Sequence, residues 1–153
     1  ILGAKIGCPD TPVIGFAGDG AFGISMNEMS SCAREEWPPI TMVIFRNYQW
    51  GAEKRNSILW FDDNFVGTEL DPDLSYAKVA NACGLKGVAV KTMEETTKAI
   101  KKSCEDQKNG ITTFVEVILN QELGEPFRRD AMKKPVEVAG INKDDMKPQK
   151  SIV

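Results

Sequence analysis

Residues 18–23 read GDGAFG, and they follow the apolar run VIGFA of residues 13–17. A short buried strand, a glycine-rich turn and a helix, in that order, form a common phosphate-binding loop. The glycines are spaced as G-x-G-x-x-G, which lets the backbone approach a diphosphate closely. Asp19, however, places a carboxylate inside this loop, where it repels a bare diphosphate. The loop therefore predicts an α/β fold and a phosphate ligand whose charge is offset by another group.

The rest of the chain alternates between short apolar runs and helical patterns. Strands are predicted at residues 13–17, 40–45, 87–90 and 112–119, and helices at residues 24–36, 74–82 and 92–107. The last of these helices begins with a capping box, TMEE. Because the strands lack polar–apolar alternation, we predict an α/β fold with a parallel sheet covered by helices on both faces. Ligands of such sheets bind beyond the carboxyl ends of the strands.

Composition excludes several classes of function. The chain has 153 residues, 42% of them hydrophobic and 27% charged, and a net charge of -3, which gives no electrostatic case for nucleic acid or an anionic membrane as main partner. Its apolar runs are far shorter than the roughly 20 residues that span a bilayer. The absence of histidine excludes Ser-His-Asp and Cys-His catalysis and histidine-bound zinc within this chain. The four cysteines lack metal-binding spacing, so we expect reduced thiols in a cytoplasmic protein.

A metal ion removes the difficulty that Asp19 poses. Mg²⁺ takes six oxygen ligands, and proteins hold it with one or two carboxylates plus the substrate's phosphates. Asn47 follows the next predicted strand, so its amide oxygen belongs to the same edge of the sheet as Asp19. Backbone N–H groups of Ala21 and Phe22 are candidates to hold phosphate oxygens. A dinucleotide site remains the alternative, with Arg46 serving a 2′-phosphate.

The G-D-G turn, with an asparagine just after the next strand, resembles the cofactor motif of the thiamine-dependent decarboxylase and acetolactate synthase superfamily. In that superfamily the metal ligands are the aspartate, the asparagine and the backbone carbonyl two residues later, which correspond to Asp19, Asn47 and Gln49. The family often has Asn-Asn where this chain has Arg46 and Asn47, a departure that leaves the ligand in place. The resemblance implies the thiamine diphosphate-binding fold and the cofactors thiamine diphosphate and Mg²⁺. It also implies cofactor contacts from Gly18, Asp19, Gly20, Ala21, Phe22, Asn47, Gln49, Trp50 and Gly51.

Longer segments bring the resemblance closer to one branch of the superfamily. FAGDGAFGISMNEM, NYQWGAEKRN, LWFDDNFVGTEL and the tail FRRDAMKKPV are similar to the sulfoacetaldehyde acetyltransferases, which convert sulfoacetaldehyde and phosphate into acetyl phosphate and sulfite. The similarity covers about residues 3–141. It implies a C-terminal cofactor-binding domain at residues 1–119, truncated at its N-terminus, and a tail at residues 120–153. An acetolactate-synthase-like carboligase or decarboxylase and a non-catalytic nucleotide-binding module remain the alternatives.

The resemblance also implies where the rest of the active site comes from. In the superfamily a glutamate on the N-terminal domain of the neighbouring subunit activates the cofactor, so no catalytic residue is expected in this chain, and the chain alone should be inactive. The working enzyme is expected to be a homodimer or homotetramer. Candidate residues for binding the anionic substrates are Lys54, Arg55, Arg128 and Arg129, the last two in a basic cluster with Lys133 and Lys134. The alternative for these charges is a solvated surface.

Overall fold

The computed structural model describes residues 1–121, except for the side chain of Leu59. The chain divides into two compact units, of which the first comprises residues 1–48 and 71–121. The described part of the second is residues 49–70. The elements of the first unit are α1 (Leu2–Gly7), β1 (Ile14–Gly18), α2 (Asp19–Ile24), α3 (Glu28–Cys32), β2 (Thr41–Arg46), α5 (Tyr76–Ala82), β3 (Lys86–Val90), α6 (Met93–Lys108) and β4 (Thr113–Ile118).

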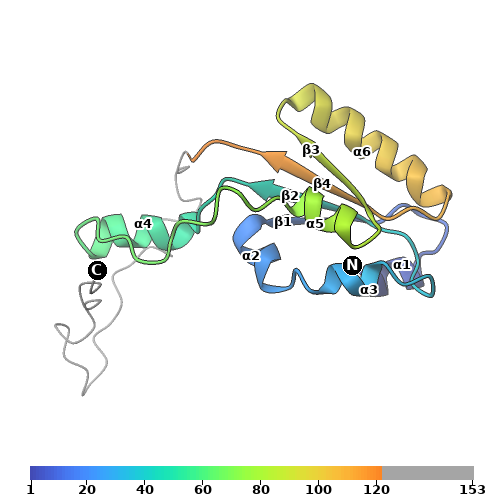
Figure 1. The fold of residues 1–153 in the computed structure, drawn as a ribbon, viewed down its shortest axis with the longest axis horizontal. Helices are drawn as coiled ribbons and strands as arrows, with labels where there is room; N and C mark the ends of the chain where they lie inside the picture. The colour runs from blue at the N-terminus through green and yellow to red at the C-terminus, as the bar shows by residue number, and fades with distance from the viewer. Residues whose placement is uncertain (122–153) are drawn as a thin grey trace, which may run out of the picture. The chain divides into compact units, whose positions relative to one another are not determined.

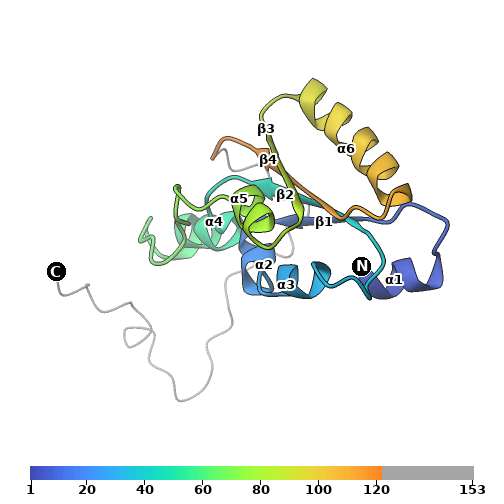
Figure 2. The same cartoon turned by 45° about the vertical axis from the view of Figure 1, so that its right-hand side comes forward.

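The four strands of the first unit form one parallel sheet in the order β1-β2-β4-β3. Helices α2 and α3 lie on one side of this sheet and α6 on the other (Figures 1 and 2). The predicted parallel α/β sheet with helices on both faces is therefore confirmed. The register pairs Gly18 with Phe45 and Arg46 with Ile118, so the carboxyl ends of β1, β2 and β4 meet at one edge. Asp19 and Asn47 leave the sheet at this edge.

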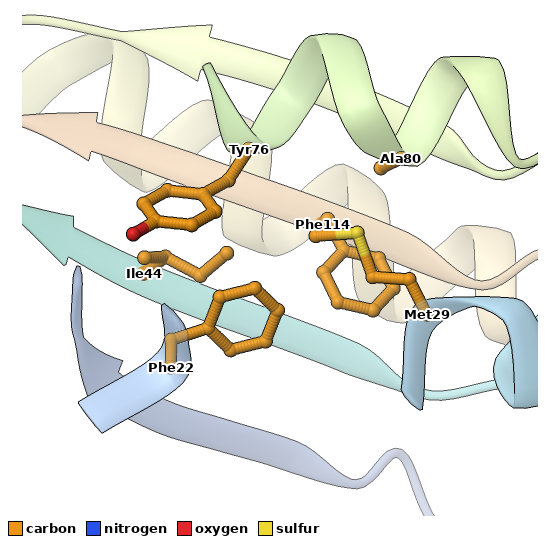
Figure 3. Close-up of a cluster of buried hydrophobic side chains, with 6 residues drawn as sticks. All are labelled: Phe22, Met29, Ile44, Tyr76, Ala80 and Phe114. Atoms are coloured by element: carbon orange, nitrogen blue, oxygen red, sulfur yellow. The ribbon is translucent and has the colours of Figure 1, made fainter. Parts of the chain in front are cut away.

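The face beneath α2, α3 and α5 holds the core that supports the glycine-rich loop. Its buried members are Phe22, Met29, Ile44, Tyr76, Ala80 and Phe114 (Figure 3). The ring of Phe22 meets that of Tyr76 edge-on, with centroids 5.3 Å apart. Phe22 and Met29 are buried, and Met26 packs against the same cluster. On the opposite face α6 packs over a cluster of valines from three strands, Val43, Val90, Val115 and Val117.

The helix predicted at residues 24–36 is wrong in its bounds. The chain turns helical at Asp19, directly after β1, and the helical segment is interrupted at Ser25, whose N–H bonds to the carbonyl of Phe22 over 3.0 Å. Gly20 and Gly23 disfavour a helix by intrinsic propensity, but the burial of Phe22 outweighs this cost. Ile24, the predicted first residue, is 72% exposed and contributes nothing to the core.

The remaining predicted elements lie within about two residues of those observed. The capping box of α6 is present in full, because the Thr92 side chain accepts from the Glu95 N–H and Glu95 accepts from the Thr92 N–H. Gly87 is required by a close approach of β3 to α5, since a Cβ there would lie 1.9 Å from the Ala77 carbonyl oxygen. None of the helices within residues 1–121 has the length and apolarity needed to cross a membrane.

The second unit contains α4 (Gly51–Trp60) and the segment that follows it. Gln49 forms an antiparallel bridge with Glu69, and Trp50 donates its N–H to the Thr68 carbonyl over 2.7 Å. Lys54 forms an ion pair with Glu69, and its ammonium lies 5.4 Å from the ring centroid of Phe65. The charged segment after Trp50 lies in this helix.

Candidate diphosphate and metal site

Asp19 joins the ends of two neighbouring strands. It is the first residue of α2 and only 3% exposed. Its Oδ1 accepts from the Gly20 N–H at 2.9 Å, and its Oδ2 accepts from the Tyr48 N–H at 2.8 Å. Each carboxylate oxygen still has a lone pair that these bonds do not use. A buried carboxylate held by two backbone donors is therefore fixed in place and able to bind a cation.

The loop after β2 places Asn47 beside this carboxylate. The nitrogen of Tyr48 that donates to Asp19 is covalently bonded to the carbonyl carbon of Asn47, so the two predicted ligands are neighbours in space. Tyr48 has φ 62°, a left-handed conformation that is costly for a bulky residue. Such conformations persist where surrounding contacts enforce them, and they gather at ligand sites.

Two charged side chains lie buried behind this loop. Arg46, the last residue of β2, and Glu116 of β4 are 4% and 0% exposed and form an ion pair of 2.5 Å. Glu116 also accepts from Ser75 Oγ at 2.7 Å and from the Ala77 N–H at 3.0 Å. Burial acts to raise the pKa of Glu116, but these hydrogen bonds and the Arg46 charge hold that pKa below its ordinary value. The carboxylate therefore stays ionised inside the fold.

Arg46 also contacts the residues around Asp19. Its Nη2 donates to the carbonyls of Asp71 and Pro72 at 3.1 and 3.0 Å. Its guanidinium carbon lies 4.5 Å from the ring centroid of Tyr48 and 5.8 Å from that of Tyr76.

Tyr76 completes these contacts by donating its hydroxyl to the Asp19 carbonyl at 3.0 Å. Burial is the main cause that raises the pKa of Tyr76, and the Asp19 charge raises it further. The hydroxyl therefore remains a donor at neutral pH.

The donors at this edge fit a magnesium ion and a diphosphate. A carboxylate and an amide oxygen are hard oxygen ligands, the kind that Mg²⁺ takes alongside phosphate oxygens. A Cβ added at Gly18 would meet no atom within 4 Å, so there is open space beside this first glycine of the loop. Within residues 1–121 no group of three or more His, Cys, Asp or Glu side chains gathers, so this part of the chain offers one carboxylate with neutral oxygens rather than a metal cage.

The predicted site residues fall into three groups. Gly18, Asp19, Gly20, Ala21, Phe22 and Asn47 lie together in the first unit at the edge just described. The Phe22 side chain points into the core, which leaves its backbone N–H as its contact for a phosphate (Figure 3). Gln49, Trp50, Gly51, Lys54 and Arg55 belong to the second unit. Arg128, Arg129, Lys133 and Lys134 lie outside the described residues.

Sequence reasoning missed Tyr76 and Glu116 as parts of the site, and it considered Arg46 only as a partner for a 2′-phosphate. One signal was available, because Glu116 interrupts the otherwise apolar run FVEVI within β4. A charge within a fully buried strand needs a partner, and Arg46 is a strand-end cation that could supply it. The pairing itself depends on the order of strands, which places β2 beside β4.

Comparisons with known proteins show the family to which the chain belongs. Residues 1–117 match the family model described as thiamine pyrophosphate enzyme, C-terminal TPP binding domain. The chain is 75% identical over 150 residues to a probable sulfoacetaldehyde acetyltransferase of Rhizobium meliloti, covering 98% of this chain and 25% of that protein. It is 68% identical over 149 residues to the sulfoacetaldehyde acetyltransferase of Roseovarius nubinhibens, covering 97% and 25% of the two chains. The chain therefore spans about a quarter of the length of these relatives.

A solved structure shares the fold. The chain superposes on the thiamine diphosphate-dependent 4-hydroxybenzoylformate decarboxylase of Rhodococcus jostii with a TM-score of 0.70 and 28% identity. The superposition covers 80% of this chain and 22% of the decarboxylase. The α/β thiamine diphosphate-binding fold is thus shared with an enzyme whose named substrate differs from that of the sulfoacetaldehyde acetyltransferases.

Proposed function

The chain belongs to the thiamine pyrophosphate enzymes as their C-terminal TPP binding domain, and from this premise we propose that it serves an enzyme that converts sulfoacetaldehyde and phosphate into acetyl phosphate and sulfite. The observation that carries the cofactor site is the buried Asp19 carboxylate, bonded to Tyr48 directly after Asn47. The names of relatives at 75% and 68% identity support the reaction. The superposed decarboxylase supports thiamine diphosphate as the cofactor. The proposed substrate rests on the names of the relatives with higher identity.

Mg²⁺ is proposed to link the loop to the diphosphate. Its ligands from this chain are the Asp19 carboxylate, the Asn47 amide oxygen and the backbone carbonyl of Gln49. The first two leave adjacent strand ends, and the third lies two residues beyond Asn47 in the chain. The N–H groups of Ala21 and Phe22, in the first turn of α2, are proposed to hold phosphate oxygens.

Thiamine diphosphate, when bound, supplies the electron sink that stabilises carbanion character at the substrate carbon. This chain's own part is to bind and orient the cofactor. Asp19, Asn47 and the α2 turn hold the diphosphate end, and we propose that Trp50 and Gly51 contact the rest of the cofactor. Binding of this kind fixes the position of the reacting group, and that is how the domain contributes to rate.

The substrates are anions, so the enzyme needs cations near the reacting centre. A sulfonate and a phosphate are tetrahedral groups, and arginine's planar fork of donors suits their oxygens. We propose Arg128 and Arg129 for this role, with Lys54 and Arg55 as further candidates. The ion pair with Glu69 already offsets the charge of Lys54, which makes Lys54 the weaker candidate for binding an anionic substrate.

We further propose that the active site is completed by a second copy of the full-length enzyme in the cytoplasm, a homodimer or homotetramer. Among residues 1–121 the buried carboxylates near the diphosphate edge are engaged, Glu116 by Arg46 and Asp19 by backbone donors. A separate glutamate from the neighbouring subunit's N-terminal domain is the group we assign to cofactor activation.

The reaction is tested by assaying the full-length enzyme for sulfite and acetyl phosphate. We expect sulfite from sulfoacetaldehyde only when phosphate is present, with acetyl phosphate as the second product. The double variant Arg128→Ala/Arg129→Ala should raise the apparent KM for phosphate or sulfoacetaldehyde about tenfold or more, since each charged hydrogen bond contributes roughly 1.5–3 kcal/mol. Arg34→Ala, which removes an exposed arginine paired with Glu36, is the control.

Two outcomes contradict parts of the proposal. An enzyme that joins two pyruvates and ignores sulfoacetaldehyde is a carboligase. Sulfite release with an unchanged KM in the double variant keeps the reaction but assigns Arg128 and Arg129 to the solvated surface.

A further inference from the structure

The proposed function assigns no role to the side chain of Arg46. The side chain is nonetheless almost fully buried, at 4% exposure. It makes an ion pair with Glu116, hydrogen bonds to two backbone carbonyls and a cation–π contact with Tyr48. A buried charge with this many partners is costly to build for stability alone, because burial of the two ions offsets most of their attraction.

One contact of Arg46 bears directly on the conformation of the loop, the contact with the ring of Tyr48. Tyr48 adopts φ 62°, and the guanidinium lies against its ring. The same backbone conformation directs the Tyr48 N–H to Oδ2 of Asp19. If the ring of Tyr48 moved away, the loop would relax toward negative φ, and the bond to Asp19 would be lost.

Glu116 fixes Arg46 from the opposite side. Its carboxylate is fully buried on β4 and is also bonded to Ser75 and Ala77 at the start of α5. The adjoining residue of that helix, Tyr76, reaches the Asp19 carbonyl. Thus Glu116 connects, through Arg46 and through α5, to two of the three groups that bond to Asp19, the Tyr48 N–H and the Tyr76 hydroxyl.

We propose that Arg46 and Glu116 are a positioning pair that holds Asn47, Tyr48 and Asp19 in the arrangement that binds the metal and the diphosphate. The pair touches neither cofactor nor substrate and acts through the loop. This inference rests on the proposed cofactor site and adds the residues that shape it. If the pair acts in this way, its variants should bind the cofactor and Mg²⁺ more weakly, and their turnover should be restored at saturating cofactor.

The test uses Arg46→Lys, Arg46→Met and Glu116→Gln in the full-length enzyme. Lysine keeps the charge but lacks the fork that reaches Glu116 and two carbonyls together. Lys86→Met is the matched control, because Lys86 pairs with the buried Asp106 at 2.5 Å from the first position of β3, at the opposite end of the strands. It breaks an ion pair to a buried carboxylate without touching the loop.

Two measurements are made on each variant. The first is hydrogen exchange of the Tyr48 amide in the cofactor-free protein, which we expect to be about tenfold or more faster in the Arg46 variants and unchanged in Lys86→Met. The second is titration with thiamine diphosphate and Mg²⁺. In the Arg46 and Glu116 variants the Kd for the cofactor should rise about tenfold or more, while kcat at saturating cofactor stays within about twofold of wild type. Arg46→Lys should lie between wild type and Arg46→Met.

The outcomes separate this inference from the proposed function. Unchanged Tyr48 exchange and cofactor affinity in Arg46→Lys and Glu116→Gln overturn the inference alone. Equal effects in Lys86→Met also overturn it, because they would show a general loss of stability. If the wild-type enzyme binds no thiamine diphosphate with Mg²⁺, the proposed function fails and the cofactor part of the inference fails with it. The exchange of Tyr48 still decides whether the pair holds the loop, including when Arg46→Met does not fold.

Discussion

Tyr48 donates its backbone N–H to Oδ2 of Asp19 over 2.8 Å, and this bond ties the loop after β2 to the first residue after β1. The two residues are far apart in the sequence and meet because their strands are parallel neighbours. The aspartate that looked misplaced in a phosphate loop is thus a buried, oriented carboxylate with capacity for a cation.

The glycines of the fold should separate into cofactor-contacting and structural positions. Gly18→Ala places a methyl group in open space, so we expect a change in unfolding free energy of less than about 1 kcal/mol but weaker binding of thiamine diphosphate. Gly87→Ala drives a Cβ into the Ala77 carbonyl and should cost about 2–3 kcal/mol or more. Chemical denaturation and cofactor titration distinguish the two. Full cofactor affinity in Gly18→Ala would show that the cofactor does not lie over this glycine.

The hydrogen bond from the Tyr76 hydroxyl to the Asp19 carbonyl should stabilise the fold. Tyr76→Phe leaves the buried Asp19 carbonyl without this donor, so we expect a loss of about 1–3 kcal/mol in unfolding free energy together with weaker cofactor binding. Tyr48→Phe is the matched control, because it keeps the ring that faces Arg46 and should change stability by less than about 0.5 kcal/mol. Urea denaturation monitors both. Equal stability of the two variants would argue that the Tyr76 hydroxyl bond contributes nothing.

Acid should weaken the fold partly through Glu116. Because its folded-state pKa is lowered, the unfolded chain takes up the proton at a higher pH than the folded one. The stabilisation is therefore complete above the ordinary carboxyl pKa of 4.5 and is lost as the pH falls through the lowered folded value. Glu116→Gln should be less stable above that pH and show a shallower decline in acid.

This dependence is measured as unfolding free energy against pH, from neutral down to the acid limit of folding. One proton fewer changes the slope by up to about 1.4 kcal/mol per pH unit. Glu94→Gln, at an exposed helix ion pair with Lys98, is the control and should leave the slope unchanged. An acid limb identical in Glu116→Gln and wild type would contradict the prediction.

The sequence predicted the sheet well because its strands are short, mostly apolar runs without regular polar–apolar alternation. Their parallel arrangement follows from the intervening helices, and the capping box located the start of α6. The helix after β1 was misplaced, because Gly20 and Gly23 hide a segment whose stability comes from burying Phe22. The position of this helix is set by tertiary packing, about which local helix propensity carries no information.

The candidate site shows a similar division. Asp19 and Asn47 were predicted as neighbours because they follow adjacent strands, and the Tyr48 bond places them together. Arg46 and Glu116 were not predicted as a pair, since β2 and β4 become neighbours only through the order of strands. The magnesium ligands remain predictions, and so do the substrate roles of Lys54, Arg55, Arg128 and Arg129.

The most direct test of the account is calorimetric titration of the full-length enzyme with thiamine diphosphate, with Mg²⁺ and with chelator. We predict that wild type binds only with Mg²⁺ and that Asp19→Ala and Asn47→Ala lose this binding. Asp19→Asn, which retains an acceptor for Tyr48 but no charge, should also lose it, and Asp10→Ala, at an exposed aspartate, should bind as wild type. Unchanged affinity in Asp19→Ala and Asn47→Ala, or metal-independent binding of NADP in place of thiamine diphosphate, would contradict the proposed site.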